Sequence, residues 1–204
     1  MDFWYIIIAA VVSYLLGSIP TSVWVGKLFY GIDVREQGSG NAGATNTFRV
    51  LGAKAAIPVF IIDVLKAYLA AKLVVFFPCL PYTPMYVNLQ LLFGICAVVG
   101  HIFPIYVGFK GGKGVASLLG VTLAISPVSA LLALAVFVVV LLITHYVSLG
   151  SMLAGCSYPL FVFFVEKTDI VSLQVFSVIF AVLLLVTHRK NIARLRNGEE
   201  KKMW

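Results

Sequence analysis

The chain has 204 residues, of which 61% are hydrophobic and 11% are charged, and its formal net charge at neutral pH is +7. Ordinary soluble domains carry about 25% charged residues, so the composition excludes a soluble protein and indicates an integral membrane protein. The two long polar stretches, Tyr30–Lys54 and His188–Trp204, are too short to form a soluble catalytic domain. Any chemistry must therefore take place at the membrane face, in short loops.

Seven apolar stretches predict an all-α polytopic membrane protein, with its transmembrane helices in a single integral membrane domain over residues 1–204. In chain order they are Phe3–Phe29, Ala55–Phe77, Met85–Val107, Val115–Ile125, Val128–Tyr146, Ser151–Val165 and Ile170–Thr187. A full span needs about 20 residues, so the fourth stretch predicts a short helix. Gly17 and Pro20 interrupt the first stretch, which membrane helices tolerate because neighbouring helices satisfy the freed backbone groups.

The Lys and Arg residues predict the orientation, because cytoplasmic loops of membrane proteins are enriched in them. With seven crossings, one set of connections holds twelve basic residues and the opposite set holds only Lys167. The twelve are Lys27, Arg35, Arg49, Lys54, Lys110, Lys113, Arg189, Lys190, Arg194, Arg196, Lys201 and Lys202. We therefore expect the N-terminus outside and the C-terminus in the cytoplasm. The alternative, that these charges only orient the chain and hold it to anionic lipid, does not explain why they alternate with glycines.

The first cytoplasmic loop, Gly31–Gly52, is rich in glycine. Gly38, Gly40 and Gly43 match the G-x-G-x-x-G pattern, but a dinucleotide-binding motif needs a strand before it, and membrane helices flank this loop. Glycines still let the backbone approach a ligand closely, and successive N–H groups form a nest for an anion. Short polar and basic side chains lie among them at Ser39, Thr45, Asn46 and Arg49. Their density favours anion binding over the alternative, a loop that is merely flexible.

The second loop, Gly100–Ala116, has Lys110 and Lys113 among four glycines before the predicted short helix. It is not a Walker A loop, because Val107 stands where the first glycine belongs and Gly114 replaces the Ser or Thr. No nucleotide or metal site is therefore predicted. Glycines and lysines before a helix N-terminus nonetheless favour phosphate binding.

Ionisable residues also lie within the predicted spans. Asp63 and Lys66 are three residues apart, close enough to pair on one helix face. Because charges within a membrane are costly, the pair either holds the bundle together or lines a site, and the structural role is slightly favoured. His101, at the end of the third stretch, is more often a packed, hydrogen-bonded group than a catalyst.

Two further segments are expected on the cytoplasmic side, the turn Thr144–Ser151 and the basic segment His188–Gly198. If the last predicted helix continues into this segment, His188 and Asn191 lie on one face. For Arg196–Lys202 a solvated basic tail is the preferred interpretation.

These loops suit a ligand with phosphate at one end and hydrocarbon at the other. The sequence contains no H-x-x-x-x-D acyltransferase motif, no G-x-S-x-G nucleophile elbow and no acidic cluster for Mg²⁺. A serine acyl-enzyme and metal-assisted phosphoryl transfer are therefore disfavoured. No carboxylate–histidine pair is evident in the loops.

Longer motifs extend over nearly the whole chain: Gly17-Ser-Ile-Pro20, Gly38-Ser-Gly-Asn-Ala-Gly-Ala-Thr-Asn46 with Arg49, Asp63-x-x-Lys66, Gly100-His-x-Phe-Pro104, Lys110-Gly-Gly-Lys-Gly-Val-Ala116, Ser148-Leu-Gly-Ser151 and His188-Arg-x-Asn-Ile-x-Arg-Leu195. In these motifs the chain resembles the bacterial acyl-phosphate:glycerol-3-phosphate acyltransferase family, called PlsY. The resemblance implies seven helices and an outside N-terminus, in agreement with the orientation predicted from charge.

The resemblance also implies the reaction. A fatty acyl group moves from acyl phosphate to the 1-hydroxyl of sn-glycerol 3-phosphate, giving lysophosphatidic acid and phosphate in the first acylation step of phospholipid synthesis. Because an acyl phosphate is already activated, proximity and charge stabilisation suffice, and no cofactor is implied. The implied partners are the two substrates, the lipid bilayer of the bacterial cytoplasmic (inner) membrane and the enzyme that produces acyl phosphate. The active site would face the cytoplasm, and no nucleic acid is expected.

The matched motifs imply the site residues. The acyl-phosphate headgroup is expected on Gly38, Ser39, Gly40, Asn41, Gly43, Ala44, Thr45, Asn46 and Lys113. Glycerol 3-phosphate is expected on Arg49, Lys113, Ser148, His188 and Asn191, with Lys113 between the two phosphates. Lys113 and His188 are the expected catalytic residues, and Asp63, Lys66, His101 and Lys110 are expected to support the site or the fold.

The sequence leaves two alternatives open. The base that takes the hydroxyl proton is either a substrate phosphate, whose second pKa is about 6, or His188. The alternative function is a transporter or flippase for a phosphorylated solute or lipid, since interrupted helices and phosphate sites also occur in such proteins. Against a transporter, the halves of the chain show no internal repeat, and the predicted anion-binding loops share one side.

Overall fold

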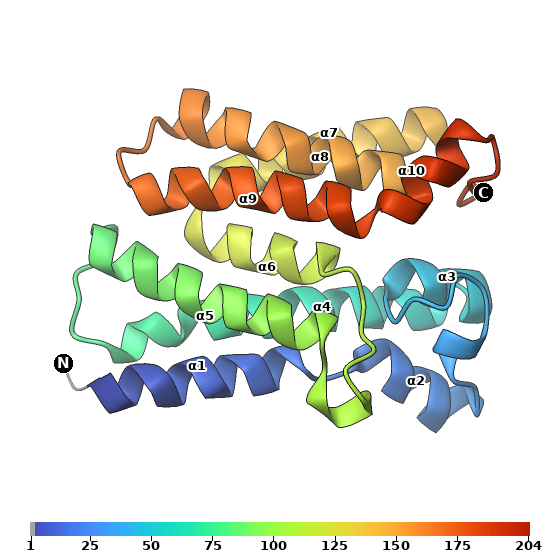
Figure 1. Ribbon diagram of the computed structural model, residues 1–204, viewed down its shortest axis with the longest axis horizontal. Helices are drawn as coiled ribbons and strands as arrows, with labels where there is room; N and C mark the ends of the chain where they lie inside the picture. The colour runs from blue at the N-terminus through green and yellow to red at the C-terminus, as the bar shows by residue number, and fades with distance from the viewer. Residues whose placement is uncertain (1–2) are drawn as a thin grey trace. The chain divides into compact units, whose positions relative to one another are not determined.

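The computed structural model describes residues 3–204, and within that range its regular elements are all helices, with no strand (Figure 1). The predicted all-α fold is thus confirmed. The chain divides into two compact units, residues 1–125 and residues 126–204. That the whole chain is one domain stays a prediction.

The first unit is built around two long helices, α4 and α5. Its α-helices are α1 (Phe3–Gly17), α2 (Thr21–Tyr30), α3 (Ala44–Leu51), α4 (Ala53–Lys72), α5 (Pro84–Ile102) and α6 (Val115–Ile125), and its 3-10 helices are η1 (Val34–Glu36), η2 (Leu73–Phe76) and η3 (Ile105–Val107). Helix α4 packs against α1, α5 and α6, and α1 also packs against α5 (Figure 1).

The second unit is a row of helices in which α8 lies between its neighbours in sequence. The elements are α7 (Pro127–Thr144), α8 (Val147–Phe161), the π-helical turn η4 (Val162–Glu166), α9 (Val171–Thr187) and α10 (Arg189–Arg196). Helix α8 packs against both α7 and α9. Pro159 lies inside α8, just before the π-helical turn, as expected because proline removes a helical hydrogen bond.

All seven predicted apolar stretches are helical, but not all of them are long and apolar enough to cross a membrane. Among the described residues, Pro84–Val107, Pro127–Thr144 and Val147–Glu166 are long and apolar enough by themselves. The number rises to five if the bent pairs α1–α2 and α9–α10 each form one span. Helix α6 is short, as predicted. Helix α4 has 20 residues but carries four charged ones, Lys54, Asp63, Lys66 and Lys72.

The predicted interruption of the first stretch is a bend of 41° between α1 and α2. Pro20 lies at this bend and has no N–H with which to continue the helix. The α1 and α5 backbones meet beside it, since a Cβ on Gly100 would lie 2.2 Å from the carbonyl oxygen of Tyr14. Small residues allow such close contact between membrane helices.

One prediction about the cytoplasmic segments is wrong in part, and a second depended on how the last helix continues. Gly31–Gly52 is not one loop, because η1 and α3 lie within it; Gly52 ends α3 with a φ of 82°, which suits glycine. The last helix does not continue straight past Thr187. Helices α9 and α10 are bent by 58° at His188, whose φ of −98° and ψ of 8° leave the α-helical region.

Candidate functional site

Asn46 fixes the shape of the first glycine loop, Gly38–Gly43. Its Oδ1 atom accepts hydrogen bonds from Ser39 N at 2.7 Å and from Ser39 Oγ at 3.1 Å. Its Nδ2 atom donates to the carbonyl oxygens of Val34 at 2.6 Å and Gln37 at 3.1 Å. Asn46 is buried. The side chains of Asn46 and Ser39, both predicted as substrate donors, are thus hydrogen-bonded to each other and shape the loop.

The loop needs glycine at two positions. Gly38 and Gly40 have φ values of 64° and 71°, which residues with a Cβ rarely adopt. A Cβ on Gly38 would also lie 2.3 Å from Asn46 Oδ1. The resulting turn leaves Gly38, Ser39 and Gly40 exposed to solvent, where a ligand can reach them.

The loop leads directly into helix α3. Gly43 is the N-cap of this helix, and no side chain caps its N-terminus. The first N–H groups of a helix, here those of Ala44, Thr45 and Asn46, have no partner within the helix, and together with the helix dipole they attract anions. The predicted anion-binding loop therefore includes a helix N-terminus. The half-buried Arg49 lies on the same helix.

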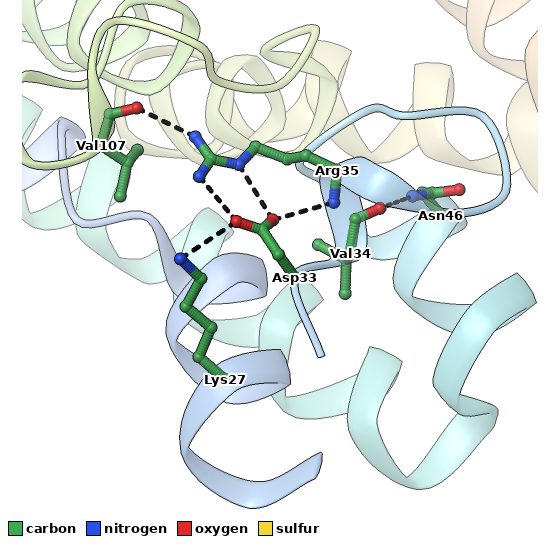
Figure 2. A network of polar contacts seen from close by, with 6 residues as sticks. All are labelled: Lys27, Asp33, Val34, Arg35, Asn46 and Val107. Carbon is green, nitrogen blue, oxygen red and sulfur yellow. Dashed lines mark hydrogen bonds and ion pairs between the residues drawn. The ribbon is translucent and has the colours of Figure 1, made fainter. Parts of the chain in front are cut away.

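An ionic network joins the first loop to the second (Figure 2). The Asp33 carboxylate accepts hydrogen bonds from Arg35 Nε at 3.0 Å and Nη2 at 2.7 Å, and Lys27 Nζ lies 3.1 Å away. Arg35 Nη1 donates to the carbonyl oxygen of Val107, in η3, at 2.9 Å. The side-chain hydrogen bonds from Arg35 hold the pKa of Asp33 well below its usual range.

The second glycine loop rests on the end of α5 and touches the first loop. Gly112 N donates to the carbonyl oxygen of His101 at 3.1 Å. A Cβ on Gly112 would lie 2.2 Å from His101 Nε2 and 2.6 Å from the carbonyl oxygen of Ala42. The structure thus brings the two predicted glycine loops together, with Lys113 next to their contact. Lys113 is half-buried, whereas Lys110 is exposed.

Asp63 and Lys66 form a buried ion pair, with Lys66 Nζ 2.6 Å from Asp63 Oδ1. Thr21 Oγ1 donates to the same carboxylate oxygen at 3.0 Å, and Lys66 Nζ donates to the carbonyl oxygen of Ile19, between α1 and α2, at 2.7 Å. The predicted pairing is confirmed. His101 Nδ1 lies 3.6 Å from Asp63 Oδ1, so a carboxylate–histidine pair does exist, between helices α4 and α5, where the loop sequences could not reveal it.

In the second unit, Glu200 gathers two predicted substrate-binding residues. Its Oε1 atom accepts from Ser148 Oγ at 2.9 Å and from Asn191 Nδ2 at 2.7 Å, and its Oε2 atom accepts from Arg194 Nε at 2.6 Å. Burial alone would raise the pKa of Glu200, but the hydrogen bonds from Arg194, Asn191 and Ser148 outweigh it and lower the pKa. The solvated-tail interpretation of Arg196–Lys202 is therefore wrong at Glu200, which is 7% exposed.

His188 is buried at the bend between α9 and α10. Its Nδ1 atom lies 2.8 Å from the carbonyl oxygen of Leu184. Because a carbonyl oxygen only accepts hydrogen bonds, this contact assigns a hydrogen to Nδ1, and in the neutral ring Nε2 is then the acceptor. An acceptor nitrogen is what either a general base or a ligand for a hydroxyl group requires.

The predicted site residues divide between the two units. The first unit contains Gly38–Asn46, Arg49, Asp63, Lys66, His101, Lys110 and Lys113, and the second contains Ser148, His188 and Asn191. Sequence reasoning missed Glu200 and the Asp33–Arg35 pair. An acidic residue within a basic segment was the available signal for Glu200, whereas no sequence pattern predicts the contact of Arg35 with Val107.

Comparison with known proteins supports one family. Residues 7–198 match the model of the glycerol-3-phosphate acyltransferase family. The proteins named glycerol-3-phosphate acyltransferase from Fusobacterium nucleatum and Chlorobaculum tepidum are 45% and 43% identical to this chain, over 94% and 95% of it and 95% and 94% of their own lengths.

Two solved structures support the same family. The crystal structure of PlsY, an integral membrane glycerol 3-phosphate acyltransferase, in its glycerol 3-phosphate form is 37% identical, with a TM-score of 0.86, and the match covers 97% of this chain and 95% of that one. Its lysophosphatidic acid form matches with a TM-score of 0.84 at 36% identity, over the same shares of the two chains. With a family match over nearly the whole length and a shared fold, the chain belongs to the glycerol-3-phosphate acyltransferase family and is an integral membrane acyltransferase.

Proposed function

We propose that this chain transfers a fatty acyl group from acyl phosphate to the 1-hydroxyl of sn-glycerol 3-phosphate, releasing lysophosphatidic acid and phosphate. One observation carries the proposal: a glycine loop opens into the uncapped N-terminus of α3, and the loop that bears Lys113 lies against it. Helix N–H groups and a lysine together form a site for a phosphate group. The PlsY structures in glycerol 3-phosphate and lysophosphatidic acid forms support the same acceptor and product.

The headgroup of acyl phosphate is assigned to the first loop and the start of α3. Backbone N–H groups at the start of α3 bind the phosphate, while the Asn46–Ser39 hydrogen bonds fix the loop that leads into this helix. The residues assigned are Gly38, Ser39, Gly40, Asn41, Gly43, Ala44, Thr45, Asn46 and Lys113. The hydrocarbon chain of the substrate lies among the apolar side chains of the bundle and the bilayer.

Glycerol 3-phosphate is assigned to Arg49, Lys113, Ser148, His188 and Asn191. Arg49 and Lys113 supply positive charge for its phosphate, and the polar residues bind the glycerol part. Lys113 also neutralises charge that develops on the reacting carbonyl and the leaving phosphate. The lysine is thereby shared by both substrates and serves catalysis as well as binding.

In the reaction, the 1-hydroxyl oxygen attacks the acyl carbonyl carbon, the bond from this carbon to the phosphate oxygen breaks, and phosphate leaves. The hydroxyl proton goes to a substrate phosphate or to His188 Nε2. Because the acyl phosphate is already activated, the protein needs to supply alignment of the two substrates and charge stabilisation.

We further propose that the protein resides in the bacterial cytoplasmic membrane, with its N-terminus outside and its active site facing the cytoplasm. The twelve basic residues predicted on one side of the membrane support this orientation. The enzyme that produces acyl phosphate is the expected supplier of the donor.

The experiment is phosphate release by the purified protein in detergent, with acyl phosphate and with or without glycerol 3-phosphate, in the presence of a chelator. Phosphate release that requires glycerol 3-phosphate and persists in the chelator supports the acyltransferase. Movement of either substrate across a vesicle membrane without phosphate release would instead support a transporter.

A further inference from the structure

The chain after α10 folds back onto the turn between α7 and α8. We call residues Glu200–Trp204 the strap. Met203 N donates to the carbonyl oxygen of His145 at 2.8 Å. The rings of Trp204 and His145 meet edge to face, with their centroids 5.1 Å apart. The far end of the strap is therefore anchored at a specific residue rather than solvated.

The anchor lies directly before a predicted substrate-binding residue. His145 ends α7 with a φ of 62°, Tyr146 follows as the N-cap of α8, and Ser148 lies in the first turn of α8. Lys202 Nζ lies 5.8 Å from the centre of the Tyr146 ring, a second contact of the strap with this turn. The strap thus runs along the segment that positions Ser148.

The near end of the strap sets the hydrogen-bonding direction of two residues. A carboxylate only accepts hydrogen bonds, so Ser148 must direct its hydroxyl hydrogen, and Asn191 an amide hydrogen, toward Glu200. With its hydrogen used in this way, Ser148 Oγ can offer a ligand only lone pairs, whereas Asn191 keeps a second amide hydrogen beside its acceptor oxygen. Acceptors suit the hydroxyl groups of a ligand and oppose its phosphate oxygens.

We propose that the strap is a specificity element: Glu200, held by the anchor at His145, orients Ser148 as the acceptor for the 2-hydroxyl hydrogen of glycerol 3-phosphate. The inference rests on the proposed function, because it assumes that glycerol 3-phosphate binds at Ser148. The lowered pKa of Glu200 supports it, since an ionised carboxylate cannot donate. A site built to hydrogen-bond a hydroxyl rejects an analogue that lacks it.

The test compares glycerol 3-phosphate with 3-hydroxypropyl phosphate, which keeps the reacting hydroxyl and the phosphate but lacks the 2-hydroxyl. We expect the unsubstituted protein to favour glycerol 3-phosphate by about 10,000-fold in kcat/KM. Equal kcat/KM values for the two acceptors would overturn the inference without any variant. If the unsubstituted protein releases no phosphate with either acceptor, the proposed function itself fails.

Three variants test the strap: Trp204→Ala, truncation after Lys202, and Glu200→Gln. Each should lower the discrimination between the two acceptors by roughly tenfold, the effect of about one charge-assisted hydrogen bond. The ratio of kcat/KM values does not depend on the fraction of protein that is folded, so partial unfolding of a variant cannot imitate this result. Unchanged discrimination in all three variants would contradict the proposal.

Two controls complete the experiment. Trp204→Phe keeps an aromatic edge on His145 and should retain the discrimination of the unsubstituted protein. Trp4→Ala removes another exposed tryptophan, 72% accessible on α1, and should leave the discrimination unchanged. If Trp4→Ala lowered the ratio as much as Trp204→Ala, the effect would be general and the strap would have no specific role.

Discussion

His101 and Gly112 are in contact at two points. The Gly112 N–H donates to the His101 carbonyl oxygen at 3.1 Å, and His101 Nε2 lies 2.2 Å from where a Cβ of residue 112 would stand. Because the Ala42 carbonyl oxygen is only 2.6 Å from the same point, an added methyl group has no room on either side. The loop that bears Lys113 is therefore held between α5 and the first glycine loop.

Gly112→Ala should displace this loop and with it Lys113. A misplacement of about 1 Å at a catalytic group can cost about 100-fold in rate, and we expect a loss of kcat of that order in the phosphate-release assay. Gly31→Asn is the matched control, because Gly31 has a left-handed φ of 66° that asparagine tolerates and no atom within 4 Å of its Cβ position. Equal losses in both variants would argue against a specific loop displacement.

Lys113→Ala should be nearly inactive yet folded. Its side chain is assigned to neutralise developing charge, and loss of one such group typically lowers kcat by about 100- to 1000-fold. Thermal unfolding in detergent and phosphate release measured side by side separate chemistry from folding. Lys54→Ala, an exposed lysine at the start of α4, should keep full activity. Near-normal turnover in Lys113→Ala would remove the central assignment.

Asn46→Ala should loosen the first loop. The substitution deletes four hydrogen bonds, one of them the buried bond to the Val34 carbonyl oxygen, which costs about 1–3 kcal/mol of the free energy of unfolding. We also expect a higher KM for acyl phosphate, because the loop leads into the N-terminus of α3, which is assigned to the phosphate of that substrate. The exposed Asn197 on the C-terminal side of α10 provides the control Asn197→Ala. An unchanged KM for acyl phosphate would mean that Asn46 stabilises the fold alone.

Asp33 should make stability depend on pH. Its pKa is lowered by folding, so its contribution is present above the unfolded value of about 4 and is lost as the pH falls toward the folded value. Asp33→Asn should therefore cost about 1 kcal/mol at pH 7, a modest figure because its partner Lys27 is exposed. The difference should shrink below about pH 4. Equilibrium unfolding at several pH values measures it, with the exposed Glu36→Gln as control.

Turnover and its pH dependence in His188→Gln and His188→Ala should identify the base that takes the hydroxyl proton. If a substrate phosphate takes the proton, both variants should keep measurable turnover, with a pH–rate profile that still rises through a pKa of about 6. Binding of glycerol 3-phosphate is measured in parallel by calorimetry. Complete loss of turnover with retained binding would instead identify His188 as the base.

The sequence predicted the helices well and the short segments less well. Long apolar stretches identify membrane helices because the requirement for length and hydrophobicity is strong, and even the short α6 was predicted with its observed bounds. Helix α3 was missed because its eight residues follow glycines and show no long apolar run. Asn46, in its first turn, bonds to Val34 and Gln37, contacts that no local pattern predicts.

Within the site, residue types were predictable but partners were not. Glycine and lysine in the loops indicated phosphate binding, since glycine-rich turns expose backbone N–H groups and lysine adds positive charge. That Ser39 is bonded to Asn46, that His101 lies beside Asp63, and that Glu200 binds Ser148 depends on tertiary packing. Patterns along a chain do not encode such distances between its segments.

The bond from Lys66 to the Ile19 carbonyl oxygen also bears on how the protein enters the membrane. Helix α4 carries Asp63 and Lys66 near its middle, and each such charge costs about 3 kcal/mol when a helix inserts alone. Ile19 and Thr21 precede α4 in the chain, so both are synthesised before it. They can therefore form hydrogen bonds with Lys66 and Asp63 as α4 emerges. The bend at Pro20 between α1 and α2 thus gives the later helix α4 polar groups to pack against. The order of synthesis thereby becomes part of the assembly of the bundle.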